Sequence, residues 1–207
     1  MATVVKTAWA MVQAKLFHLS DLVFGQLVSG RNTATEHLEN VIGPCVNIVP
    51  VRVQIHPDQR IAELLSMVQA QHAHSIPYET CGLRAIVKNS TSWPRHTDFG
   101  SVVHHRNSGD QYTLQSDKLT CHVDAWSPVS SPSMNTWIAT TADKDQLIIN
   151  IFSRSEIVTS AHMGMLVKEM AEELAFVCNF FFFMPFSIFF FFFFFFFFLG
   201  IATRSCI

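Results

Sequence analysis

Two adjacent histidines, His104 and His105, are the residues whose types most directly suggest chemistry in this sequence. They precede a short polar segment that ends in the carboxylate of Asp110. An imidazole titrates near neutral pH and can remove a proton from a reacting group, so His105 is a candidate general base. The alternative is a pair of histidines at the end of a β-strand, with no catalytic role. We favour this alternative, which makes His105 a weak candidate and assigns no catalytic residue.

A metal site is the second kind of chemistry to consider, because His72, His74 and Glu79 lie close together in the sequence. Histidines two residues apart on a helix point to different faces, and no cysteine joins them at the spacing of a zinc site. We therefore predict no metal site. Arg31, after a Ser-Gly pair, could bind an anion or a buried carboxylate, or could be a surface arginine at a turn. The sequence leaves these alternatives open.

Composition excludes several classes of protein. The chain has 207 residues, of which 49% are hydrophobic and 14% charged, with a net charge of −2. These values exclude a disordered tail and a polycationic nucleic-acid binder. The five cysteines form no CxxC pair, and the N-terminus lacks the pattern of a secretory signal. We expect free thiols and a cytoplasmic location.

The C-terminal segment is dominated by phenylalanine. Of the 20 Phe residues, 15 lie between Phe180 and Phe198. Leu174–Ile201 is long and apolar enough to span a membrane, but natural spans mix aliphatic residues and end in aromatic or basic anchors. We interpret residues 178–207 as a low-complexity tail that arises from a gene-model artefact, such as a translated intron. A true membrane anchor is the alternative.

Before this tail, the hydrophobic pattern predicts alternating helices and strands. Helical spacing of apolar residues predicts Thr3–Phe17 as a surface helix, a helix from Asp58 that ends before Pro77, and Ala161–Val177. The predicted strands are Asp21–Ser29, Cys45–Ile55, Phe99–His105, Leu119–Trp126, Thr136–Thr141 and Gln146–Phe152.

Two of these strands carry more detailed predictions. Pro50 removes a backbone donor, so its strand should be bulged or lie at an edge. Gln146–Phe152 has the continuous apolar pattern of a strand buried on both faces. The order of elements predicts one layered α/β lobe over residues 1–177.

Four segments, in the same order along the chain, resemble the C-terminal lobe of a condensation domain of fungal nonribosomal peptide synthetases. Val41, Ile42, Gly43, Val46 and Asn47 match the fifth core motif of this family, and His74, Pro77, Tyr78 and Glu79 match the sixth. The seventh motif is degenerate. The four segments are DLVFGQLVSGRN (21–32), ENVIGPCVNIVPVRV (39–53), ELLSMVQAQHAHSIPYETCGL (63–83) and WPRHTDFGSVVHHRN (93–107).

The resemblance implies a fold and a reaction. The family belongs to the chloramphenicol-acetyltransferase-like superfamily, and each of its two lobes has a mixed sheet with helices packed on it, as in CoA-dependent acyltransferases. It forms amide bonds between thioesters carried on the phosphopantetheine arms of carrier domains. The implied partners are an N-terminal lobe and the adenylation and peptidyl carrier domains of a synthetase, and no cofactor is bound directly. Neither nucleic acid nor a membrane is an expected partner.

The resemblance also implies roles for particular residues. Arg31, Gly43 and Asn47 would line or support the substrate tunnel between the lobes, where the Asn47 carboxamide could orient a thioester or an amine. Arg31 could pair with the aspartate of the HHxxxDG motif, which belongs to the N-terminal lobe and is absent from this chain. We therefore expect a fragment that is inactive alone. The alternatives are a membrane-anchored scaffold protein and a stand-alone acyltransferase that uses His105.

Overall fold

A computed structural model describes residues 1–31, 40–106, 113–116, 119–122, 135–143, 146–154 and 156–182. Its centre is a five-stranded sheet in the order β2-β1-β3-β6-β7. The pairs β1–β3 and β3–β6 are parallel, whereas β1–β2 and β6–β7 are antiparallel, so the predicted mixed sheet is confirmed. The strands are β1 (Asp21–Val28), β2 (Asn47–Gln54), β3 (Ser101–Arg106), β6 (Thr136–Asp143) and β7 (Gln146–Ser153).

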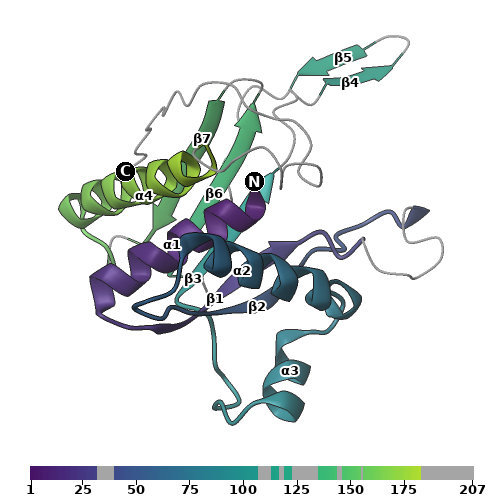
Figure 1. Cartoon of the computed structure of the whole chain (residues 1–207). Coiled ribbons are helices and arrows are strands. Elements are labelled where there is room, and N and C mark those ends of the chain that lie inside the picture. Colours follow the sequence, from purple (N-terminus) through teal and green to yellow (C-terminus); the bar gives the residue numbers. More distant parts are fainter. Residues whose placement is uncertain are drawn as a thin grey trace.

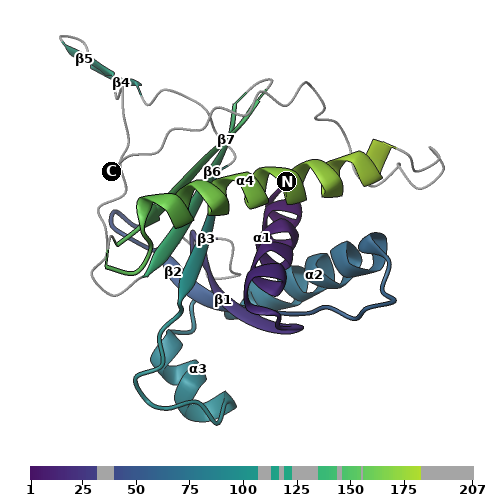
Figure 2. The same cartoon turned by 90° about the vertical axis from the view of Figure 1, so that its left-hand side faces the viewer.

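Three helices cover one face of this sheet (Figures 1 and 2). They are α1 (Ala2–Phe17), α2 (Ile61–Ser75) and α4 (Ser160–Phe182). The first helix lies on the core, as predicted, but it is more enclosed than a surface helix, because α1 packs against both α2 and α4 as well as the sheet. Every residue from Val5 to Ala10 is consequently buried.

The helix α3 (Leu83–Ser90) and the strand β4 (Thr113–Ser116) have no counterpart in the predicted elements. The short helix α3 lies below the sheet in Figure 1 and buries only Val87. Strands β4 and β5 (Leu119–His122) form a separate two-stranded sheet that projects from the body. The predicted strand Leu119–Trp126 thus pairs with β4 rather than with the main sheet, and its last four residues lie outside the described part of the chain.

Helix ends differ from the prediction by a few residues. The second helix begins at Ile61 rather than Asp58, because the Glu63 carboxylate accepts a hydrogen bond from the main-chain nitrogen of Arg60 and so caps the helix there. It ends at Ser75, as predicted, and a 3₁₀ turn, η2 (Ile76–Tyr78), follows.

The last helix runs to Phe182, five residues beyond the predicted end at Val177. The helix therefore continues past residue 177, which is the predicted boundary between the lobe and the tail. The division of the chain into these two regions stays a prediction. No helix within the described ranges is long and apolar enough to cross a membrane.

The two outer strands of the main sheet test two predictions. Pro50 lies in β2, at one edge of the sheet, and pairs in continuous register with Gly25, so the edge position is confirmed without a bulge. The prediction that β7 is buried on both faces is wrong. Its residues Leu147, Ile149 and Ile151 are buried, whereas Ile148 and Phe152 are half-buried, because the three helices cover only one face of the sheet.

Candidate functional site

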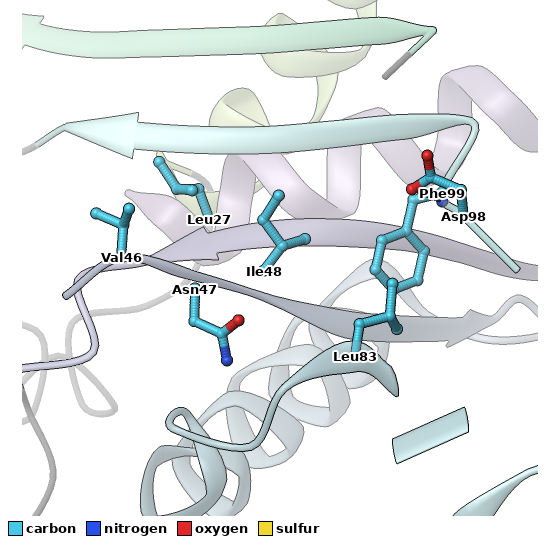
Figure 3. Close-up of a pocket in the computed structure, with 7 residues that line it drawn as sticks. All are labelled: Leu27, Val46, Asn47, Ile48, Leu83, Asp98 and Phe99. Carbon is cyan, nitrogen blue, oxygen red and sulfur yellow. Dashed lines mark hydrogen bonds between the residues drawn. The ribbon is translucent and has the colours of Figure 1, made fainter. Parts of the chain in front are cut away.

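A pocket lies against the first two strands of the sheet. Its volume is about 320 Å³, and its lining is mostly apolar (Figure 3). Leu27 on β1 lies directly opposite Ile48 on β2. In each strand the next residue is buried in the core beneath the helices, so the side chains of Leu27 and Ile48 point to the other face of the sheet. The pocket therefore uses the sheet face that points away from the helices. Its lining residues are Leu27, Val46, Asn47, Ile48, Leu83, Asp98 and Phe99.

One wall of the pocket depends on a glycine in the middle of β1. An added Cβ at Gly25 would lie only 2.8 Å from Cγ2 of Ile48 and 2.8 Å from Cδ2 of Phe99. The Phe99 ring, which is 4% exposed, thus packs directly on the backbone of the strand. The sequence analysis assigned no role to Gly25 or Phe99. A glycine inside a strand is itself a signal of close backbone approach, and it could have identified this position.

We expect Gly25→Ala to destabilise the chain by about 1–3 kcal/mol, because a methyl group forced into a filled space displaces the Phe99 ring. Urea unfolding monitored by circular dichroism measures this change. Gly100→Ala is the matched control, because an added Cβ there meets no atom within 4 Å. Phe99→Leu should recover part of the loss in the Gly25→Ala background. Equal unfolding midpoints for the two alanine variants would contradict the close packing of Phe99.

Asn47 is among the residues that line the pocket, but its carboxamide lies on the opposite side of β2 from the side chains of Val46 and Ile48 (Figure 3). Its Nδ2 donates to the carbonyl oxygens of Glu79 and Cys81, both at 2.8 Å. An amide nitrogen has two donors, so both are used. The remaining group, Oδ1, can only accept a hydrogen bond. The role predicted for Asn47, in orienting a thioester or an amine, stays a prediction.

Arg31 and Gly43 come together at the end of the β1–β2 pair. The Nη2 of Arg31 donates to the carbonyl oxygens of Val41 and Gly43, at 3.0 and 3.1 Å. Neither predicted partner, an anion or a buried carboxylate, is needed to explain these contacts. Arg31 thus supports the loop that leads to Asn47 and is not among the residues that line the pocket, while its predicted pairing with an anion or a carboxylate stays a prediction.

The histidine doublet lies elsewhere in the fold. His105 shares a short hydrogen bond with the buried Thr140, with 2.8 Å between Nδ1 and Oγ1, across the β3–β6 pair. Its neighbour His104 packs edge-on against Trp137, and burial lowers the pKa of this imidazole. Neither histidine is among the residues that line the pocket. His105 therefore lies outside this pocket.

The residues considered for a metal site take other positions. His74 is exposed, His72 is half-buried, and Glu79 is buried. Within the described ranges, no group of three His, Cys, Asp or Glu side chains could hold a metal ion. Of the cysteines, Cys45, Cys81 and Cys178 are free thiols.

Comparison with known proteins identifies the family. A family model for the condensation domain matches residues 1–138. The sequence is 32% identical over 181 residues to the nonribosomal peptide synthetase opaA of Aspergillus ustus, which covers 86% of this chain and 5% of that protein. It is 44% identical over 112 residues to the synthetase lenA of Aspergillus lentulus, covering 54% of this chain and 2% of that protein.

Solved structures agree with this result. The crystal structure of holo T3CT matches with a TM-score of 0.73 at 26% identity, covering 84% of this chain and 40% of that one. The starter condensation domain of rhizomide synthetase RzmA, at 12% identity and a TM-score of 0.61, shows the shared fold. The chain therefore belongs to the condensation-domain family of fungal nonribosomal peptide synthetases, and the predicted family and acyltransferase-like fold are confirmed. Neither the scaffold nor the stand-alone acyltransferase receives support.

Proposed function

We propose that this chain forms the C-terminal lobe of a condensation domain and supplies one wall of its substrate tunnel. The lobe assignment is supported by coverage, since the chain matches 40% of the holo T3CT chain. In the reaction, the amine of one carrier-bound aminoacyl thioester attacks the carbonyl carbon of another thioester. A C–N bond forms and a C–S bond breaks, and the proton lost by the amine is taken up by the departing thiolate, which leaves as the thiol.

The observation that carries this proposal is the apolar pocket on the first two strands, in a chain whose sequence and fold match condensation domains. The apolar lining would limit the access of water, which would hydrolyse the thioester. The residues of this chain therefore form a wall against which the substrates are held together. The general base would come from the HHxxxDG motif of an N-terminal lobe.

The proposal includes the partners that deliver and enclose the substrates. They are the N-terminal lobe, the adenylation domains that load amino acids, and the peptidyl carrier domains with phosphopantetheine arms. The chain itself binds no cofactor in this scheme, and the reaction takes place in the cytoplasm. The relatives support such an assembly, because this chain spans only 5% of opaA and 2% of lenA.

We expect the purified full chain to form no amide product from two loaded carrier domains, because the general base lies outside it. Mass spectrometry of the released dipeptide measures this. A matching N-terminal lobe, supplied by co-expression, should restore product. Product from the chain alone that vanishes in His105→Ala would overturn the proposal and make His105 the base. Failure of the co-expressed lobes to form product would contradict the assignment of this chain as the missing half.

A further inference from the structure

The last strand of the main sheet, β7, has one free edge. It pairs with β6 in continuous register, and within the described part of the chain no strand lies on its other side. Its sequence, QLIINIFS, contains no charged residue and no proline. Edge strands are usually protected by charges, proline or a bulge, because their unpaired backbone groups can pair with another chain. The free edge of β7 lacks all three of these protections.

The hydrogen bonds of β6 show which residues of β7 face this edge. The main-chain nitrogen of Thr136 donates to the carbonyl oxygen of Gly100 at 3.1 Å, so the backbone groups of Thr136 point towards β3. Backbone groups alternate between the two sides of a strand, so those of Ala139 point the other way, towards its register partner Asn150. Asn150 and every second residue from it therefore bond to β6. The remaining residues of β7 face the free edge, and they are Leu147, Ile149, Ile151 and Ser153.

The opposite edge of the sheet, at β2, is protected. The carbonyl oxygen of Arg52 accepts a hydrogen bond from Nε2 of Gln71 at 2.8 Å, so Arg52 faces that edge and its acceptor is already used. Pro50 faces the same edge, because backbone directions repeat at every second residue, and it has no N–H to donate. Of the two edges of the sheet, β7 is therefore the one that can accept another strand.

We propose that β7 binds the β7 strand of a second copy of this chain, as an antiparallel pair about a two-fold axis. The two sheets then become one continuous sheet, with the helices of both copies on the same side. A strand without charges can pair with itself, because no like charges come to lie opposite each other. This proposal concerns the assembly of the chain, and it goes beyond the role of the chain in amide formation.

The sequence of β7 complements itself in one register. Residues that face the edge must lie opposite residues that face the edge, so that each pair exchanges hydrogen bonds. When Asn150 lies on the axis, opposite its own copy, Ile149 lies opposite Ile151 on the helix-covered face. On the open face, the half-buried Ile148 then lies opposite the half-buried Phe152, and both lose contact with water. With Ile149 on the axis instead, Ile148 would lie opposite the polar Asn150, so the first register is favoured.

Hydrogen exchange of the full chain, followed by NMR, tests the pairing. We expect the main-chain amides of Ile149 and Ile151 to exchange about tenfold more slowly in the wild type than in Asn150→Lys, in which like charges would meet across the axis. An equal mixture of Asn150→Lys and Asn150→Asp should restore the slow exchange, which local fraying of β7 would not do. The Arg52 amide, which faces the other edge, is the internal control and should exchange equally in all samples. Equal rates for Ile149 and Ile151 in all samples would overturn the proposal.

Cross-linking tests the register and does not depend on the charged variants. The two Asn150 residues would form a non-hydrogen-bonded pair, whose Cα atoms lie about 4.5 Å apart, within the range of a disulfide. Asn150→Cys should therefore form a covalent dimer under mild oxidation, seen on a non-reducing gel above the wild-type background. Ile148→Cys is the matched control, because it would lie opposite Phe152 and not opposite itself. If Asn150→Cys links no more than Ile148→Cys, the proposal is refuted. Neither assay uses a substrate, so failure here is distinguishable from failure of the amide-forming assay.

Discussion

Replacing Gly30 by alanine is expected to destabilise the chain by about 3 kcal/mol or more, enough to prevent folding in many domains of this size. Gly30 is buried and has a φ of 64°, a left-handed conformation that costs other residues energy. An added Cβ would also overlap the carbonyl oxygen of Cys45 and lie 3.2 Å from its carbon. Both obstacles are in the backbone, so no side-chain rotation relieves them.

The measurement is the urea midpoint of the Gly30→Ala variant together with its soluble yield. Gly164→Ala is the matched control, because Gly164 is an exposed glycine of α4 with open space around it. Alanine is favoured over glycine inside a helix by about 0.5–1 kcal/mol, so this control should become more stable. If the urea midpoints of both variants moved in the same direction, the close contact of the Gly30 turn with Cys45 would be refuted.

Phe24→Ala is expected to cost about 3–5 kcal/mol, because it leaves a cavity where a fully buried aromatic ring stood. Phe24 is 0% exposed and lies on β1, an inner strand of the sheet, on the face covered by the helices. It belongs to the same core cluster as Trp9 of α1 and Val103 of β3. Its loss should therefore weaken the packing between α1 and the sheet.

The matched control for this second change is Phe17→Ala. Phe17 ends α1 and is 62% exposed, so its removal should change the free energy of unfolding by no more than about 0.5 kcal/mol. Urea titration of both variants gives the two values under identical conditions. If Phe17→Ala proved as costly as Phe24→Ala, the position of the core between the helices and the sheet would be wrong.

The two sides of the sheet have different tasks in this fold. The helix-covered side holds the apolar core, and the opposite side forms the pocket. Asn47 ties the start of β2 to the turn that contains Glu79, because its Nδ2 donates to the carbonyl oxygen of Glu79.

Local pattern alone determined much of the secondary structure. The apolar spacing in residues 3–17 and 161–177 placed α1 and α4, and the backbone donor that Pro50 lacks indicated an edge position for β2. These features are readable because a helix and a strand each impose their own period on the residues that face the core. The family was also readable, since its motifs are short and keep their order along the chain.

The tertiary structure decided what these elements touch. Periodicity gives the number of apolar faces that a segment shows but not the number of neighbours that cover it, so the burial of α1 between α2 and α4 could not be predicted. No pattern in the sequence indicates that Lys6 is buried, because its hydrogen-bond partner Gln26 lies on a different element. The pocket likewise depends on contacts between distant segments, namely Phe99 on Gly25 and Asn47 on the turn at Glu79. Only the folded chain brings these residues together, and their partners determine what chemistry each one can do.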